Sequence, residues 1–345
     1  MADVVRTGRS DWIDAAKGIG IVLVVYGHLL SSAVRAGVAI PQQFFNVSDS
    51  VLYSFHMPLF FFLAGLLAEH SYSRRGARSF IADKFTYLAY PYLVWSILQV
   101  GVECFVTRNS EHPVAIADLL LVPIRPHEQF WFLYALFWCY ASYALSRQSV
   151  QWGRPLLVLA AVALFWYPIR TEFLALYDFS MQLIFFVSGV CVSSRLLKTV
   201  RGSHDVLWTM LRASSFLICA LSAFLWFVPP MRLTEDYGAY PLLLLGLAAL
   251  GIAATVGVTR TSAATKFGRA ASAIGRYSMP IFLAHMLVGV PARILLTKSG
   301  MENPWLVLTV SVMLAVLVPI LIYRAASAKG FRLLFAWTSA RSSAV

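Results

Sequence analysis

A long apolar segment near the start of the chain reads Trp12-Ile-Asp-Ala-Ala-Lys-Gly-Ile-Gly-Ile-Val-Leu-Val-Val-Tyr-Gly-His28. At about 100° per helical residue, Lys17 and His28 project in nearly the same direction, and the rise between them is about 16 Å. Asp14 lies within roughly 40° of the same line, one turn before Lys17. If the segment crosses a bilayer, this stripe places Asp14 and Lys17, which can form an ion pair, at the rim and the imidazole of His28 deep in the hydrocarbon. Ionisable groups at such depth are costly, so they predict a functional site.

The composition of the whole chain indicates a membrane protein. Hydrophobic residues make up 59% of its 345 residues, charged residues make up 13%, and the mean hydropathy is +0.71. A soluble domain carries about 25% charged residues. Apolar stretches of about 20 residues suit a hydrocarbon core about 30 Å thick. They predict an all-α, polytopic transmembrane helical bundle of about 10 helices, at residues 13–34, 51–69, 85–106, 129–146, 155–170, 179–197, 207–228, 239–258, 277–296 and 304–324.

The basic residues orient this bundle. With the N-terminus in the cytoplasm, the inner segments hold 21 of the 28 Lys and Arg residues and the outer segments hold 7. This bias predicts that both termini are cytoplasmic, in a multi-pass protein of the bacterial inner membrane. The net charge of +12 is then a topology signal, and no nucleic-acid partner is expected. Residues 1–325 are expected to form the membrane domain, and the basic residues 326–345 a loose cytoplasmic tail.

Two other interpretations of local patterns are disfavoured. Ser31-Ser32-Ala33 resembles a signal-peptide cleavage site, but Asp11 and Asp14 precede the apolar run and His28 interrupts it. The four cysteines fall inside predicted spans without metal-like spacing, and no His/Cys metal motif is present. We therefore expect no metal site and no disulfide framework.

Other chemistry-bearing residues stand at the starts and ends of later spans. The second span contains His56-Met-Pro-Leu-Phe-Phe-Phe-Leu-Ala-Gly65, where Pro58 is expected to kink the helix. A basic loop is expected between His70 and Lys84. The long outer loop 107–128 is acidic and leads into Glu128 and Trp131. In the ninth predicted span, His285 lies about 14 Å from the inner rim.

These motifs resemble the acyltransferase 3 family of integral membrane O-acyltransferases, in particular its fucose 4-O-acetylase-like branch. The resemblance covers most of the chain, and its strongest element is the basic residue, ten intervening positions and histidine of Lys17 to His28. Further similar segments are His56–Gly65, Lys84–Trp95, Trp131–Leu133 and Gly275–His285. The resemblance implies transfer of an acyl group, acetyl by default, from cytoplasmic acyl-CoA to a hydroxyl of a cell-surface or lipid-linked glycan.

Roles follow from this resemblance together with side-chain chemistry. His28 is the candidate catalytic residue, as general base or as transient acyl carrier. A cytoplasmic mouth of Asp14, Lys17, Arg78 and Lys84 would receive the phosphates of acetyl-CoA, the acyl donor. His56, Glu128, Trp131 and His285 are expected to line the acceptor side or the cavity. The alternative is that individual members of these sets serve only packing or topology.

Two other function classes remain open from the sequence. Intramembrane ionisable groups also mark the substrate pathways of secondary transporters. Such transporters often consist of two related halves. The sixth predicted span, however, has no counterpart of Lys17 or His28, which disfavours the transporter class. A non-catalytic membrane subunit of a glycan-assembly system would need the fold but would tolerate the loss of His28.

Overall fold

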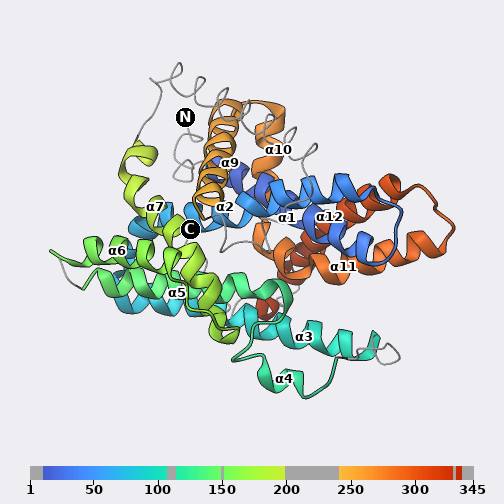
Figure 1. The fold of residues 1–345 in the computed structure, drawn as a ribbon, viewed down its shortest axis with the longest axis horizontal. Coiled ribbons are helices and arrows are strands. Elements are labelled where there is room, and N and C mark those ends of the chain that lie inside the picture. The colour runs from blue at the N-terminus through green and yellow to red at the C-terminus, as the bar shows by residue number, and fades with distance from the viewer. Residues whose placement is uncertain (1–10, 107–113, 149–150, 199–240, 329–331, 336–345) are drawn as a thin grey trace. The chain divides into compact units, whose positions relative to one another are not determined.

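The computed structural model describes residues 11–106, 114–148, 151–198, 241–328 and 332–335 (Figure 1). Within these ranges the secondary structure is helical and contains no strands, which confirms the all-α prediction. Six helical stretches of the described chain are long and apolar enough to cross a membrane: Asp11–Arg35, Gln42–Val106, Phe173–Ser194, Pro241–Ser262, Ser278–Lys298 and Pro304–Ala328. The count of about 10 stays a prediction, because 207–228 lies outside the described residues and the helices α5 (Trp131–Ser146) and α6 (Gly153–Trp166) are shorter.

The chain divides into two compact units. The described residues of the first unit are 11–60 and 241–324. Those of the second unit fall within 61–198 and 325–335. The helix α2 (Gln42–Lys84) begins in the first unit and continues into the second.

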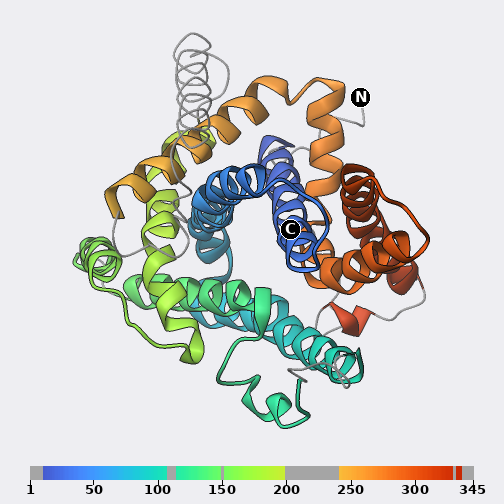
Figure 2. The ribbon, with the colours of Figure 1, turned by 45° about the vertical axis from the view of Figure 1, so that its right-hand side comes forward.

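In the first unit, α1 (Asp11–Arg35) packs against α9 (Pro241–Ser262), α10 (Lys266–Gly275) and α11 (Ser278–Lys298) (Figure 2). Two glycines bring α1 and α10 into backbone contact. A Cβ at Gly18 would collide with the Ala271 carbonyl, and one at Gly275 would collide with the Asp14 carbonyl. Small residues permit such close approach of membrane helices, and here they fix the end of α1 that carries Asp14.

The helices α11 and α12 (Pro304–Ala328) form an antiparallel pair in the same unit. Gly289 lies against Ala315 near the middle of the pair. At the other end, Arg324 donates from Nε to the Tyr277 hydroxyl at 3.2 Å and also lies over the Tyr277 ring.

The second unit is built from the rest of α2 with α3 (Tyr90–Val106), α5, α6 and α7 (Leu176–Lys198), and α5 packs against both α6 and α7. Glycines again allow a close crossing, since Gly65 lies against the Phe186 carbonyl and Gly189 against the Phe62 carbonyl. Edge-to-face aromatic pairs such as Phe80–Tyr140 and Tyr140–Phe186 fill the space between the helices.

The basic stretch 70–84 was expected to be a loop, and that expectation is wrong. It continues α2 as helix to Lys84, interrupted at Gly76 (φ 72°, ψ 168°), and a π-helical turn over Phe85–Ala89 leads into α3. Phe80 explains the helical state, because its side chain is fully buried against Tyr72 and Tyr140. Pro58 lies inside α2, and the break in helical dihedral angles falls at Gly76.

A short part of the expected tail is described. Residues 332–334 form a 3₁₀ turn, and the Leu334 carbonyl accepts a hydrogen bond from the Trp95 indole at 2.7 Å. Phe335 packs on the same indole, with ring centroids 5.7 Å apart. Residues 336–345 lie outside the described residues.

Candidate active site

Three histidines from three helices of the first unit lie close together. The ring centroids of His28 on α1 and His285 on α11 are 5.3 Å apart. Tyr53 on α2 lies between His28 and the third histidine, His56. Its ring centroid is 6.2 Å from that of His28 and 4.8 Å from that of His56. The sequence predicted these histidines one helix at a time, and the fold brings them into one cluster.

Hydrogen bonds to the backbone fix the tautomers of two of these imidazoles. Nδ1 of His285 lies 2.7 Å from the Phe282 carbonyl, and Nδ1 of His56 lies 2.5 Å from the Leu52 carbonyl. A carbonyl can only accept, so Nδ1 carries the proton and Nε2 keeps its lone pair. Nε2 of His285 is buried and has no hydrogen-bond partner.

His28 differs from the other two in its environment. Its side chain is half-buried, and neither ring nitrogen forms a hydrogen bond within the described part of the chain. The next residue, Leu29, packs against Gly289 of α11, which holds this turn of α1 against that helix. An imidazole with open nitrogens can take up or deliver a proton.

The end of α1 that precedes His28 carries the predicted donor residues. Asp14 is only 2% exposed and Lys17 is half-buried, both next to the crossing with α10. Gly275 of α10 contacts the Asp14 backbone, so the next two residues, Arg276 and Tyr277, lie close to this helix crossing.

Arg35 and Arg293, which the sequence counted among the basic residues of the outer segments, belong to helices of the first unit. Arg35 is the last residue of α1, and Arg293 lies inside α11, where it is 9% exposed. Nε of Arg293 is buried without a hydrogen-bond partner. The charge of Arg35 acts on both Arg293 and His28. The missed signal was the position of Arg293 two turns after His285 in a predicted span.

The remaining donor-side candidates lie in the second unit. Lys84 is positioned over the rings of Tyr140 and Phe80, at 4.2 and 5.1 Å from their centroids. Arg78 is exposed and has no partner among the described residues. That Lys17, Arg78 and Lys84 bind one donor therefore stays a prediction.

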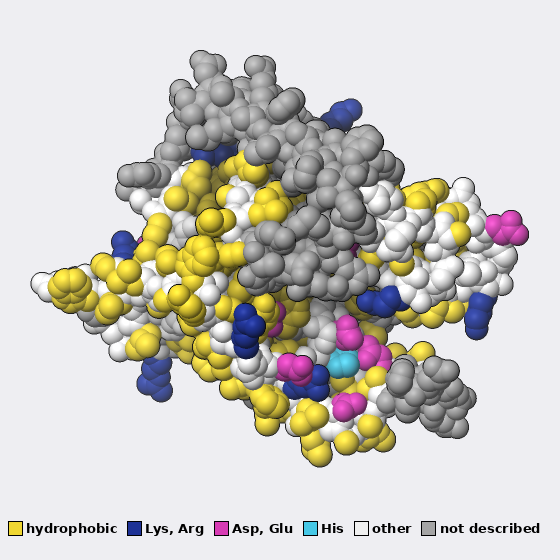
Figure 3. All heavy atoms as spheres, in the orientation of Figure 1, with side chains coloured by type: hydrophobic (Ala, Val, Ile, Leu, Met, Phe, Trp, Pro, Cys, Tyr) yellow, Lys and Arg dark blue, Asp and Glu magenta, His cyan; other side chains and the backbone are white. Residues whose placement is uncertain are grey.

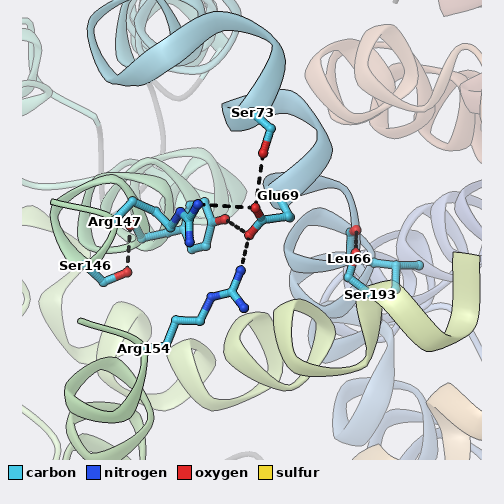
Figure 4. Close-up of polar contacts among 8 residues, drawn as sticks. Leu66, Glu69, Ser73, Ser146, Arg147, Arg154 and Ser193 are labelled. Atoms are coloured by element: carbon cyan, nitrogen blue, oxygen red, sulfur yellow. Dashed lines mark hydrogen bonds and ion pairs between the residues drawn. The ribbon is translucent and has the colours of Figure 1, made fainter. Parts of the chain in front are cut away.

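A polar cluster that the sequence did not predict joins α2, α5 and α6 (Figure 4). Glu69 accepts hydrogen bonds from the Tyr143 hydroxyl at 2.6 Å and from Arg154 at 2.5 Å. Arg147 lies 3.5 Å from the other carboxylate oxygen, which also accepts from Ser73. Glu69 and Arg154 line a pocket of about 640 Å³ that continues between apolar side chains of α6 and α7.

The opposite end of α5 carries the acidic residues of the expected acceptor side. Acidic side chains gather around a histidine near α3 and α4 (Asp118–Leu121) (Figure 3). Nε2 of His127 lies 2.7 Å from Glu103, and Glu128 stands beside it with a strained φ of 44°. Burial opposes the imidazolium charge, but the hydrogen bond and the charge of Glu103 outweigh it and raise the pKa of His127. A pocket of about 280 Å³ is lined here by Asp118, Arg125, His127 and Glu128, among others.

Trp131 packs inside the second unit rather than lining this pocket. Its ring stacks on Phe61 at 6.4 Å with an interplanar angle of 13° and meets Phe132 edge-on. Metal binding has no candidate among the described residues, because no three His, Cys, Asp or Glu side chains there are grouped to hold an ion.

Helices long and apolar enough to span a membrane, with His56, His285 and Arg293 buried in the same chain, indicate a multi-pass membrane protein. A family model described as "Acyltransferase domain" matches residues 10–324. The chain therefore belongs to the acyltransferase 3 family, as its motifs had suggested.

Two curated relatives are similar to about half of the chain or somewhat more. The nodulation protein NolL of Sinorhizobium fredii is 27% identical over 214 residues, which are 61% of this chain and 54% of that protein. The nodulation protein NolL of Mesorhizobium japonicum is 24% identical over 199 residues, 56% of this chain and 50% of that protein. The chain thus spans about half the length of these relatives. No solved structure matches it.

Proposed function

We propose that this protein is a membrane O-acyltransferase of the bacterial inner membrane. It moves an acyl group, acetyl by family default, from cytoplasmic acyl-CoA to a hydroxyl of a cell-surface or lipid-linked glycan. His28 is the catalytic residue. The observation that carries this proposal is the open imidazole of His28, 5.3 Å from the ring of His285, in a chain of the acyltransferase 3 family.

The α1 helix supplies the geometry for a donor that enters from one end. Lys17 and His28 share a stripe with a rise of about 16 Å between them, in a helix unbroken from Asp11 to Arg35. The phosphates of CoA need cations, and Lys17 offers one at the helix end. The thioester would then extend along the stripe toward the imidazole.

The chemistry proposed for His28 is general-base catalysis. A ring nitrogen takes the proton of the acceptor hydroxyl while its oxygen attacks the thioester carbonyl. The carbon–sulfur bond breaks, the CoA thiolate leaves, and the proton held by His28 neutralises it. Transient acylation of His28 is the second route: the imidazole attacks the thioester, the carbon–sulfur bond breaks and CoA thiolate leaves. The acceptor hydroxyl then attacks the acyl-imidazole, the acyl–nitrogen bond breaks, and the hydroxyl proton neutralises the thiolate.

Candidate acceptor-side residues occur in each of the two units. In the first unit, His285 lies beside His28 and His56 lies beyond Tyr53, and both have Nδ1 bonded to a backbone carbonyl and Nε2 as an acceptor. In the second unit, Glu128 lines the pocket that also contains His127. Carboxylates and imidazoles are suitable hydrogen-bond partners of sugar hydroxyls.

The test is acyl transfer by the purified protein in liposomes, with radiolabelled acetyl-CoA and surface glycan isolated from a deletion strain. Label should appear on the glycan with the wild type. His28→Ala should reduce the rate by about 10²–10⁴-fold, the usual contribution of a general acid or base. His70→Ala is the matched control, because His70 is exposed on α2 and outside the histidine cluster.

Three outcomes would contradict parts of the proposal. Full transfer by correctly inserted His28→Ala excludes His28 as the catalytic residue. Glycan uptake into the liposomes without labelling favours a transporter. The third outcome is that the liposomes show neither transfer nor uptake, while His28→Ala restores glycan labelling in cells of the deletion strain. That outcome favours a non-catalytic subunit.

A further inference from the structure

A buried arginine in the first unit has no role in the chemistry proposed above. Arg293 is 9% exposed, five residues before the end of α11, and its buried Nε has no hydrogen-bond partner among the described residues. It forms no ion pair with the described residues. A buried guanidinium normally meets a carboxylate, a phosphate or a row of carbonyls, because its desolvation is otherwise not compensated.

A second unpaired cation stands next to it. Arg35 ends α1 and is likewise in no hydrogen bond or ion pair within the described chain. The charge of Arg35 acts on Arg293. Neither arginine has an anionic partner within the described chain, and Arg35 is exposed, so the pair is open to an anion from outside the chain.

The position of the pair relates it to the histidine cluster. Arg35 follows His28 by seven residues on α1, which is about 10 Å along the axis and within about 20° of the same stripe. Arg293 follows His285 by eight residues on α11, about 12 Å along that axis. Both arginines therefore lie beyond the imidazoles, on the side away from Lys17.

We propose that Arg35 and Arg293 bind the anionic group of the acceptor, a phosphate or a carboxylate, and so hold its hydroxyl near His28. This inference rests on the proposed function. The α1 stripe would then carry one cation for the donor, the imidazole, and one cation for the acceptor. The planar guanidinium suits this task, since it presents two parallel N–H donors to a phosphate or carboxylate.

Two sources can supply this anion, and the experiment separates them. A lipid-linked acceptor carries a phosphate or diphosphate between lipid and sugar, whereas an acidic glycan carries a carboxylate on the sugar itself. The probes are citronellyl diphosphate for the first source and methyl glucuronide for the second. Methyl glucoside and citronellol are the neutral counterparts. Binding is measured to the full chain in nanodiscs of phosphatidylcholine, which has no net charge to compete.

The wild type should bind at least one anionic probe and should bind the neutral counterparts at least tenfold more weakly. Arg293→Gln and Arg35→Gln should each weaken anion binding by about tenfold to a hundredfold, the effect of losing a charge-assisted hydrogen bond. Arg293→Lys keeps the charge but loses the two-pronged geometry, and an intermediate affinity is expected. Lys298→Gln is the matched control, because it removes an exposed charge at the end of the same helix.

Failure of this inference is distinguishable from failure of the proposed function. Acyl transfer to a glycan, with no anion binding or with binding unchanged in both glutamine variants, overturns the anion site and leaves the function standing. Anion binding that depends on Arg293, in a protein without any acyl transfer, overturns the function and leaves the anion site standing. Since Arg35 is exposed, Arg35→Gln keeps the test decisive if Arg293→Gln does not fold.

Discussion

At the scale of single residues, the three clustered histidines differ in what their nitrogens can do. His56 and His285 each donate a hydrogen bond from Nδ1 to a carbonyl of their own helix. Neither ring nitrogen of His28 forms a hydrogen bond within the described chain. A group that reacts must have a free nitrogen and must not be sealed from substrate, and His28 has two unbonded nitrogens within the described chain and a half-buried side chain. His285 meets only the first, because its free Nε2 is buried. This difference in environment supports the proposal that His28 reacts and His285 positions it.

His285→Leu should slow acyl transfer at saturating donor by about tenfold to a hundredfold, the cost of small misplacements at a reacting group. The KM for acetyl-CoA should change little, since His285 packs beside His28 and not beside Lys17. His285→Gln should recover part of the rate by replacing one hydrogen bond. Steady-state kinetics in liposomes measures both parameters. A raised KM with unchanged kcat would place His285 in donor binding instead.

His127 gives a pH-dependent contribution to stability outside the spanning segments. Burial lowers the pKa of His127, but the hydrogen bond to Glu103 and the charge of Glu103 outweigh it. The pKa of His127 is therefore raised in the folded protein. The ion pair of protonated His127 with Glu103 therefore stabilises the fold fully below the ordinary histidine pKa of about 6.5. This stabilisation is lost as the pH rises through the higher pKa that His127 has in the folded protein. Thermal unfolding should show a Tm advantage of the wild type over His127→Gln that shrinks between pH 6 and pH 9. A difference that grows with pH would contradict the assigned pair.

At the scale of helices, backbone contacts at glycine decide where the functional ends meet. Gly18 sits on the Ala271 carbonyl, so a side chain there must separate α1 from α10. Gly18→Val should lower the Tm strongly and reduce the yield of monodisperse protein, because overpacking of this kind costs about 1–3 kcal/mol or more. Gly246→Val on α9 is the matched control, since its Cβ would meet no atom within 4 Å. Equal losses in both variants would mean that the crossing is not tight.

The Glu69 cluster links three helices of the second unit through one carboxylate. Glu69→Ala leaves Arg147, Arg154 and the Tyr143 hydroxyl without their shared acceptor, which should cost about 1–3 kcal/mol. Unfolding followed by intrinsic fluorescence in detergent measures the loss. Arg78→Gln, at an exposed and unpaired position, should leave the Tm unchanged. A neutral Glu69→Ala would mean that water satisfies both arginines equally well.

At the scale of the whole molecule, most helices predicted from hydropathy lie within a few residues of helices that the structure describes, but 51–69 is only part of the longer α2, and 207–228 lies outside the described residues. The segment 13–34 corresponds to Asp11–Arg35, and 277–296 to Ser278–Lys298. Hydropathy fails at 70–84, because charged and small residues there are helical around one buried phenylalanine. The sequence also counts Arg293 only as an outer basic residue, although it lies within the predicted span 277–296. Contacts between distant helices decide both cases, and a pattern within one segment carries no information about them.

The candidate site was predictable to a similar degree. Periodicity placed Lys17 and His28 on one stripe, since both belong to the same helix. The meeting of His28 with His285 depends on the packing of α1 against α11, 257 positions apart in the chain. The Glu69 cluster likewise joins residues of three helices, and no local motif marks it.

The orientation of the whole chain is the remaining prediction from the basic residues, and cysteine labelling tests it. In a variant with the four native cysteines replaced by alanine, Ala39→Cys follows α1 and Ala264→Cys precedes α10, at positions that are both exposed. With the N-terminus in the cytoplasm, a membrane-impermeant maleimide added to spheroplasts should label Cys at position 39. Position 264 should be labelled only after the membrane is opened. The reverse pattern would put Lys17 on the outer face, away from cytoplasmic acyl-CoA, and the direction of transfer proposed for His28 would then be wrong.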